Sequence, residues 1–169
     1  MTFPHSLFLL LTVLSLMLPS ALPAATPAAP HKVILLDDFE NLSGWSAATS
    51  PGARLEIAQD IGRDGRRAMR LDFEFQEGAS FVIARKTFRM RLPENFVFRY
   101  AIRGEAPRSD VEFKLVDARQ NVWWSKQRDQ DFPADWQPVT VKKRHLQLAW
   151  GPGGAMEQVQ EIEFALSAS

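Results

Sequence analysis

The segment "DVEFKLVDARQNVWW", residues 110–124, contains two stretches of strand-like sequence on either side of a polar turn. In "DVEFKLV", residues 110–116, every second residue is apolar. Because successive side chains of a strand point to opposite faces, this alternation predicts a strand with one buried and one polar face. The polar residues "DARQN" predict a turn, and a second strand is predicted over residues 122–126.

The same alternation returns in "MRLDFEF", residues 69–75, and in "QEIEFAL", residues 160–166. Shorter strands are also predicted over residues 33–39, 54–58, 80–86, 95–103, 138–143 and 146–150. About ten short strands separated by turns predict an all-β protein, an antiparallel β-sandwich of the jelly-roll type. The apolar positions of the three clearest strands are expected to fill the core: Phe73, Phe75, Phe113, Leu115, Ile162 and Phe164.

The N-terminal region differs in composition from the rest of the chain. Residues 7–18, "LFLLLTVLSLML", are apolar, and a stretch rich in proline and small residues follows them. This pattern is typical of a secretory signal peptide, and it is shorter than the roughly 20 residues of a membrane span. We therefore predict a secreted or periplasmic protein with no membrane span after cleavage. The predicted parts are a signal peptide over residues 1–25, cleaved between about residues 21 and 29, a Pro/Ala linker over 26–32, and one β-sandwich domain over 33–169.

The net charge bears on the kind of partner, and the cysteine content bears on how the domain is stabilised. The chain has 20 Lys and Arg against 20 Asp and Glu, all of them after residue 31, so the predicted domain has no net charge. Nucleic acid is therefore not an expected partner, because phosphate binding requires a basic surplus. Without cysteine the domain has no disulfides and depends on packing, for which 12 Phe and five Trp supply aromatic side chains.

Several stretches of the chain resemble one family of domains. These stretches are "LLDDFENLSGW" (residues 35–45), "VEFKLVDARQNVWW" (111–124), "FPADWQPVTVKKRHLQLAWGPGG" (132–154) and "IEFALSA" (162–168). They resemble the galactose-binding-like jelly rolls of bacterial carbohydrate-binding modules near family eleven, which also occur beside discoidin-like domains in large exported proteins. The resemblance covers about residues 33–168, nearly the whole predicted domain.

The resemblance implies a carbohydrate partner and an association with other domains or subunits of a larger exported protein. Domains of this kind continue past "IEFALSA" into a glycine-rich turn and a last strand beside the first one. The resemblance therefore implies that this chain lacks the last strand. In that case residues 33–39 are expected to form an exposed strand edge.

The tryptophans and the charged strand faces supply the candidate ligand-binding residues. If Val122 is buried, strand parity places Trp124 inside and Trp123 outside, where an indole can stack on a sugar ring. The alternative is that Trp123 packs under a loop. Trp150 precedes a Gly-Pro turn and is expected to line a loop pocket. Charged residues on predicted outward positions are the further candidates, although a plainly solvated face has the same pattern: Arg70, Asp72, Glu112 and Lys114.

The carboxylates of Asp37, Asp38 and Glu40 are the candidate metal ligands. Three carboxylates within four residues match the oxygen ligands of a structural Ca²⁺ near the chain ends of a jelly roll. Solvated or turn-capping side chains are the alternative. The sequence predicts no other cofactor.

Catalytic motifs are missing from the predicted domain. Glu161 and Glu163 share one face of a predicted strand, but Ala165 occupies the next position on that face. There is no cysteine and no Gly-x-Ser-x-Gly sequence, and His145 is the single histidine after residue 31. The sequence thus favours a non-catalytic carbohydrate-binding module that docks onto poly- or oligosaccharide.

Two alternatives remain for the function: a structural or protein-interaction β-sandwich, and a fragment of a glycoside hydrolase. Two or more outward aromatic side chains would favour the sugar. A flat charged face would favour the interaction domain.

Overall fold

The computed structural model describes residues 32–76, 78 and 80–168. The predicted signal peptide and most of the predicted linker lie outside the described residues. The chain falls into two units, Met1–Ile34 and Leu35–Ser169, and the fold is that of the second unit. Within the described residues, no helix combines the length and the apolar character needed to cross a membrane.

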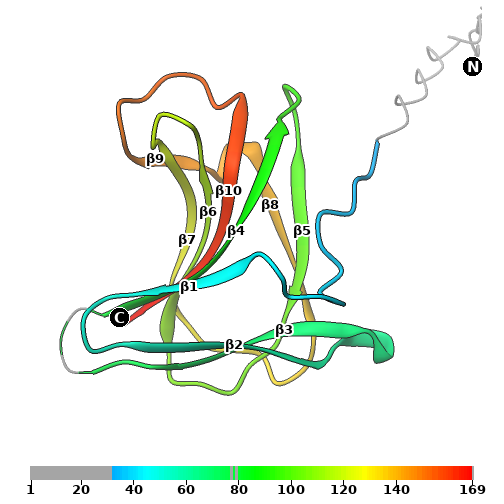
Figure 1. The fold of residues 1–169 in the computed structure, drawn as a ribbon, viewed down its shortest axis with the longest axis vertical. Coiled ribbons are helices and arrows are strands. Elements are labelled where there is room, and N and C mark those ends of the chain that lie inside the picture. Colours follow the sequence, from blue (N-terminus) through cyan, green and yellow to red (C-terminus); the bar gives the residue numbers. More distant parts are fainter. Residues whose placement is uncertain (1–31, 77, 79, 169) are drawn as a thin grey trace, which may run out of the picture. The chain divides into compact units, whose positions relative to one another are not determined.

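The described residues form ten strands and two short 3-10 turns, so the predicted all-β fold is confirmed (Figure 1). The strands are β1 (Trp45–Thr49), β2 (Arg54–Ile61), β3 (Arg67–Glu74), β4 (Phe81–Arg91), β5 (Val97–Ile102), β6 (Ser109–Val116), β7 (Val122–Gln130), β8 (Gln137–Lys142), β9 (Gln147–Trp150) and β10 (Gln158–Ala168). The turns are η1 (Arg63–Gly65) and η2 (Lys143–His145).

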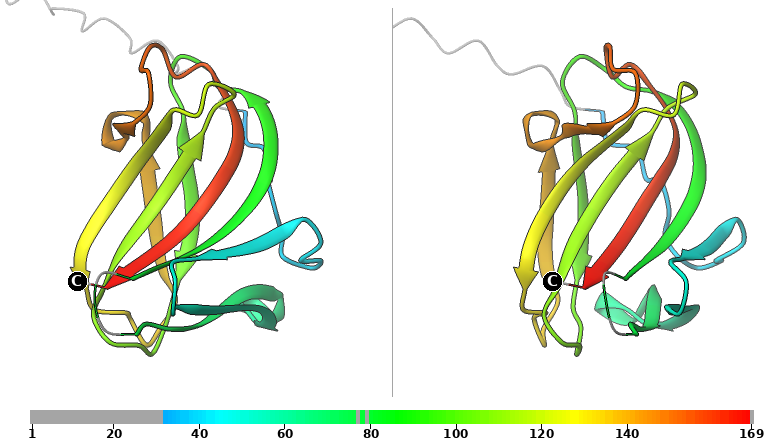
Figure 2. Two further views of the ribbon diagram at one scale, coloured as in Figure 1. Left: turned by 60° about the vertical axis from the view of Figure 1, so that its left-hand side comes forward. Right: turned by 90° about the vertical axis from the view of Figure 1, so that its left-hand side faces the viewer.

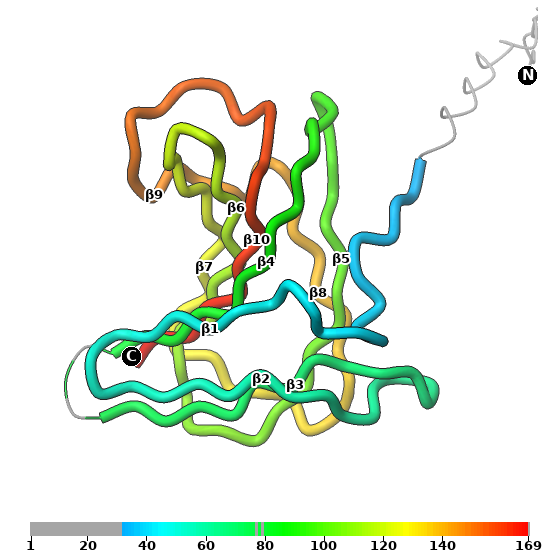
Figure 3. The backbone as a smooth tube through the Cα atoms, viewed as in Figure 1, coloured from blue at the N-terminus to red at the C-terminus, as the bar shows by residue number. Residues whose placement is uncertain are grey.

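Every described strand pairs antiparallel, in one large sheet and two small ones. The large sheet has the strand order β1-β4-β10-β6-β7-β9, and the small sheets are the pairs β2–β3 and β5–β8. In Figure 2 the strands β4, β10, β6 and β7 lie side by side, with β5 and β8 in a second layer. Figure 3 shows the β2–β3 hairpin crossing near the C-terminal end of β10. The arrangement is a β-sandwich.

The core consists of two apolar clusters on the inner face of the large sheet. The first lies against β5–β8 and contains Phe113, Leu115 and Ile162, with Phe164 packed against it. The second lies against β2–β3, where Phe73 and Phe75 pack on Val82, Val111 and Leu166. The six expected core residues are confirmed as members of these clusters, three buried and three partly buried.

The first predicted strand is wrong, and the structure explains why. Residues 32–38 form no strand. At the end of this segment, Asp37 and Asp38 accept hydrogen bonds from the backbone N–H groups two residues further on, at Phe39 and Glu40. Such bonds turn the backbone away from an extended conformation, and Phe39 has a φ of 58°. The exposed edge expected at residues 33–39 is therefore wrong as well. The large sheet ends instead at β1, which the sequence pattern did not indicate, and at β9.

Candidate functional site

The outer face of the large sheet, which points away from both apolar clusters, carries a band of charged and aromatic side chains. Lys114 of β6 lies between Glu163 of β10 and Trp124 of β7 in the register of the strands. Two residues further along each strand, Glu112 of β6 lies opposite Lys126 of β7. The register of three neighbouring strands thus places acidic, basic and aromatic groups in adjacent rows.

Four charged residues of β6 and β7 on the outer face are joined in one network of ion pairs. Lys114 Nζ lies 2.8 Å from Glu112 Oε2, and Lys126 Nζ lies 2.9 Å from Glu112 Oε1 and 2.8 Å from Asp110 Oδ2. The side chains of Glu112 and Lys114 are only 6% and 7% exposed. Buried charges persist in proteins when they are paired and hydrogen-bonded, so this network holds its members in place.

The ion pairs favour the ionised forms of Lys126 and Asp110. Burial acts to lower the pKa of Lys126, but hydrogen bonds and attraction from Asp110 and Glu112 outweigh burial and raise that pKa. The hydrogen bond from Lys126, together with one from the backbone N–H of Asp129, lowers the pKa of Asp110. The lysine ammonium and the aspartate are therefore both charged at neutral pH.

Two tryptophans border the charged band. The rings of Trp124 and Trp150 meet edge to face, with centroids 5.8 Å apart. Lys126 Nζ lies 5.3 Å from the Trp124 ring centroid and Lys114 Nζ lies 5.3 Å from that of Trp150, in the geometry of cation–π contacts. Trp150 nevertheless remains 51% exposed, so part of its surface is open to a ligand.

A buried asparagine holds the loop that follows Trp150. Asn121 Nδ2 donates to Asp117 Oδ2 and to the Gly153 carbonyl, and Asn121 Oδ1 accepts from the Gly153 N–H at 2.7 Å. A Cβ on Gly151, which has a φ of 116°, would lie 2.6 Å from Asn121 Oδ1. Only glycine fits this close approach. The β6–β7 turn thereby positions Trp150 beside Trp124.

The predicted outward placement of Trp123 is wrong. Trp123 lies opposite Leu115 and packs against the first apolar cluster, on the inner face. Val122 is indeed buried, but it lies on the outer face opposite Val116 and beside Trp150. Because Val122 is buried without facing the core, the positions predicted for the two tryptophans were exchanged.

Of the other predicted site residues, the structure brings Glu112, Lys114 and Trp150 together. It separates Arg70 and Asp72 from them, because both lie on β3 in the β2–β3 hairpin. There Arg70 forms exposed ion pairs with Asp72 at 2.9 Å and with Asp60 at 3.0 Å. These two residues are not part of the outer-face site.

Four residues of the outer face were not predicted from the sequence as site residues: Asp110, Trp124, Lys126 and Glu163. The position of the predicted turn "DARQN", residues 117–121, was a usable signal for two of them, because its end residues pair with each other. The backbone N–H of Asp117 donates to the carbonyl of Asn121, which pairs these positions across the turn. Counting outward from that pair places Trp124 opposite Lys114 and, two residues on, Lys126 opposite Glu112.

The three carboxylates predicted to bind calcium are already engaged by protein groups. Asp37 Oδ2 lies 2.7 Å from Lys86 Nζ and accepts a hydrogen bond from the Trp45 indole N–H at 2.9 Å. Glu40 accepts a hydrogen bond from the backbone N–H of Arg67. No three His, Cys, Asp or Glu side chains within the described ranges form a metal-binding group. Calcium binding stays a prediction, and the contact with Lys86 argues against Asp37 as a ligand.

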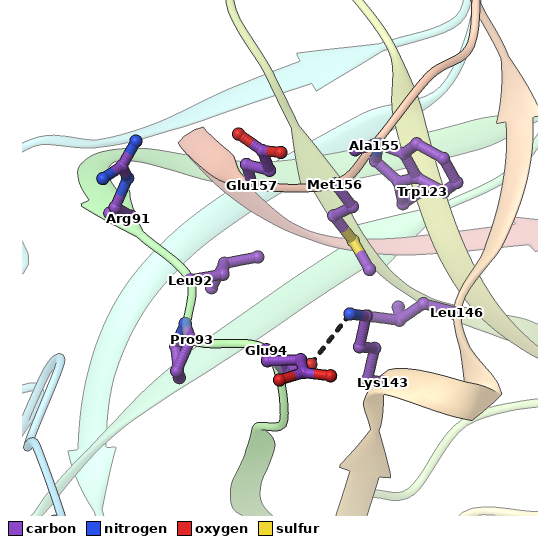
Figure 4. Close-up of a pocket in the computed structure, with 10 residues that line it drawn as sticks. All are labelled: Arg91, Leu92, Pro93, Glu94, Trp123, Lys143, Leu146, Ala155, Met156 and Glu157. Carbon is purple, nitrogen blue, oxygen red and sulfur yellow. Dashed lines mark hydrogen bonds between the residues drawn. The ribbon is translucent and has the colours of Figure 1, made fainter.

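A separate pocket of about 530 Å³ opens at the end of the sandwich where β4 passes into β5 (Figure 4). It is lined by Arg91, Leu92, Pro93, Glu94, Trp123, Lys143, Leu146, Ala155, Met156 and Glu157. Lys143 Nζ donates to the Glu94 carbonyl at 2.8 Å, and the positive and negative side chains around the pocket are equal in number. The Trp123 Nε1 atom is buried, with no hydrogen-bond partner in the described part of the chain, so it offers no donor at the pocket surface. The outer face is therefore the stronger candidate.

Comparison with known proteins shows which solved structures have a similar fold. No family model and no curated protein matches the sequence. Among solved structures, the chain is similar to the family 11 carbohydrate-binding module of a cellulosomal cellulase of Clostridium thermocellum, with 14% identity and a TM-score of 0.56 over 79% of this chain and 89% of that one. A second structure, a family 11 module from the same organism in complex with a β-1,3-1,4-mixed-linked tetrasaccharide, gives 13% identity and a TM-score of 0.53 over 78% and 89%. The predicted β-sandwich jelly roll is thus confirmed.

Proposed function

We propose that this protein is a non-catalytic carbohydrate-binding module that docks onto poly- or oligosaccharide through the outer face of the large sheet. The observation that carries the proposal is the Trp124–Trp150 pair, which borders a band of buried charges on a face pointing away from the core. Indole rings stack on the C–H face of a sugar, and charged groups exchange hydrogen bonds with its hydroxyls.

The rigidity of the band supports this function. Its lysines and carboxylates are held by ion pairs at 2.8–2.9 Å, so a ligand need not order them. Side-chain ordering is one of the main costs of binding, and a preformed site avoids it. Two outward tryptophans also favour a sugar over the alternative of a structural or protein-interaction domain. The tetrasaccharide complex of the similar Clostridium thermocellum module supports the same choice.

The placement of the carboxylates supports a binding role without catalysis. A glycoside hydrolase usually needs two carboxyl groups that flank the scissile bond from different sides. Glu161 and Glu163 approach from one strand and one face, and the next position on that face is Ala165. The alternative of a glycoside hydrolase fragment therefore has no matching pair on β10. Export and attachment to further domains complete the proposal and rest on the N-terminal sequence and on the resemblance.

The proposal is tested by glycan-array screening of the purified protein, followed by titration with the β-1,3-1,4-mixed-linked tetrasaccharide, cellotetraose and xylotetraose. We expect binding by the wild type and none by the double variant Trp124→Ala/Trp150→Ala. Trp136→Ala is the matched control, because Trp136 is partly buried and contacts Arg103, the residue after β5, rather than the outer face. Repeating the titrations with calcium and with a chelator tests the prediction for Asp37, Asp38 and Glu40. A wild-type protein that binds no glycan contradicts the proposed function.

A further inference from the structure

Glu163 is an exception among the buried charged residues of the described chain. The buried ionisable side chains are Asp110, Glu112, Lys114, Asp117 and Glu163. Asp110, Glu112 and Lys114 take part in the ion pairs of the outer face, and Asp117 accepts hydrogen bonds from Asn121. Glu163 is 7% exposed, and its carboxylate has neither an ion pair nor a hydrogen bond within the described residues. Its oxygen atoms keep some contact with solvent, because they are not among the fully buried side-chain atoms that lack a partner in the described chain.

The groups around Glu163 explain why it lacks a partner. Its register neighbours are Lys114 of β6 and Arg85 of β4. Lys114 is bound to Glu112 at 2.8 Å, and Arg85 is exposed. Burial raises the pKa of Glu163, repulsion from Glu161 and Glu112 adds to the effect, and attraction from Lys114 and Arg85 opposes it. The nearby positive charges therefore do not compensate the loss of water around this carboxylate.

A largely buried carboxylate without a protein partner destabilises a fold, and such groups occur where binding or catalysis requires them. Glu163 lies in the same cross-strand row as Lys114 and Trp124, two strand spacings from Trp124, or about 10 Å. A glycan with one ring stacked on Trp124 can thus continue across the strands, over Lys114 and on to Glu163.

We propose that Glu163 is the carboxylate of the outer face that accepts hydrogen bonds directly from ligand hydroxyls, from a chain that crosses the strands. Glu112 and Asp110 have a different task, because they hold Lys114 and Lys126 in place. This inference rests on the proposed function. Glu163 then contacts the ligand, whereas Glu112 and Asp110 hold the neighbouring lysines in fixed positions.

The proposal has two consequences that a purely structural role for Glu163 does not share. Hydroxyl groups donate to the ionised form of Glu163, so ligand binding lowers its pKa, and affinity falls as the pH falls through the pKa of the free protein. In the free protein, burial makes the ionised form unfavourable. Removing this charge at neutral pH is therefore expected to leave the stability unchanged or to increase it.

The test compares Glu163→Gln with Glu161→Gln, a carboxylate on the same strand and face. Both variants and the wild type are titrated with the mixed-linked tetrasaccharide, cellotetraose and xylotetraose from pH 7 to about pH 4.5, just above the usual glutamate pKa, and their melting temperatures are measured at pH 7. We expect Glu163→Gln to bind about tenfold more weakly at pH 7, to lose most of the pH dependence, and to melt no lower than the wild type. We expect Glu161→Gln to keep both the affinity and the pH dependence.

Each contrary result has one meaning. If Glu163→Gln binds with wild-type affinity and pH dependence, Glu163 is not the ligand contact, and the proposed function still stands. If Glu163→Gln weakens binding only together with a lower melting temperature, its role is structural, and the inference is overturned. If the wild type binds none of the three oligosaccharides and no glycan on the array, the proposed function and this inference fail together.

Discussion

Trp123 and Trp124 are adjacent in the sequence and lie in opposite environments. Trp123 packs among apolar side chains opposite Leu115. Trp124 lies opposite Lys114, with the ammonium of Lys126 5.3 Å from its ring centroid. The two faces of one strand therefore depend on different physics, apolar burial on the inner face and pairing of charges on the outer face.

This difference determines how each face responds to mutation. Apolar burial is non-directional and roughly proportional to area, so the inner face loses stability according to the volume removed. A buried ion pair contributes little net stability, because desolvation offsets its attraction, but removal of one partner leaves an uncompensated charge. The outer face should therefore be sensitive to the identity of single charged groups.

The largest expected effect is that of Glu112→Ala. This change leaves the buried Lys114 without its ion-pair partner in the described chain, whereas Lys126 keeps its contact with Asp110. We expect a loss of about 3–5 kcal/mol in the free energy of unfolding, measured by urea denaturation. Glu161→Ala, which removes a less buried carboxylate with no ion pair in the described chain, should cost less than about 1 kcal/mol. Equal effects of the two variants would show that the network does not matter for stability.

Trp123→Ala should have the next largest effect and should act on stability alone. Removal of a large core aromatic costs about 3 kcal/mol or slightly more, and Trp123 is a partly buried member of the first apolar cluster. Urea denaturation measures the loss, and titration at low temperature measures the affinity of the folded fraction. A stable Trp123→Ala variant with weakened glycan binding would reverse the assignment of the two faces.

Trp150→Ala should give the opposite pattern. Its ring is half exposed, so we expect a change of no more than about 1 kcal/mol in stability. Loss of the stacking contact should weaken glycan binding about tenfold, which corresponds to about 1.4 kcal/mol. Calorimetric titration beside a thermal melt separates the two quantities. Unchanged affinity in this variant would remove Trp150 from the site.

The smallest expected effect is a pH dependence of stability from Asp110. The hydrogen bond from Lys126 is the main cause that lowers the pKa of Asp110 in the folded protein. The resulting stabilisation is complete above the pKa of an unfolded aspartate, about 4, and is lost as the pH falls through the lowered folded value. We expect Asp110→Asn to cost about 1 kcal/mol at pH 7 and progressively less below about pH 4. A difference that stays constant down to pH 2 would show that Asp110 does not depend on this charge pair.

Local patterns in the sequence were sufficient for much of the fold. The alternation in residues 69–75, 110–116 and 160–166 correctly predicted β3, β6 and β10 and the inward faces of all three, because period-two alternation depends only on the pleat of the strand. The same patterning placed Glu112 and Lys114 away from the core. It failed over residues 33–39, which form no strand and end in a turn where two aspartate side chains accept hydrogen bonds from the backbone.

The candidate site depended on the tertiary structure, because its residues meet only through strand register. Lys114, Glu163 and Arg85 lie in one cross-strand row although they are far apart in the sequence, and no local pattern contains that pairing. The alternation of apolar and polar residues also does not predict that the charged residues of β6 are buried. Alternation indicates the face on which a side chain lies, but not whether other groups cover that face. Alternation shows which residues of a strand share a face, but one residue of known orientation is needed to tell which face is inward. Val122 misled this assignment for β7, because it is buried on the outer face. The identity of each strand followed from its own residues, whereas the site followed from which strands lie beside one another.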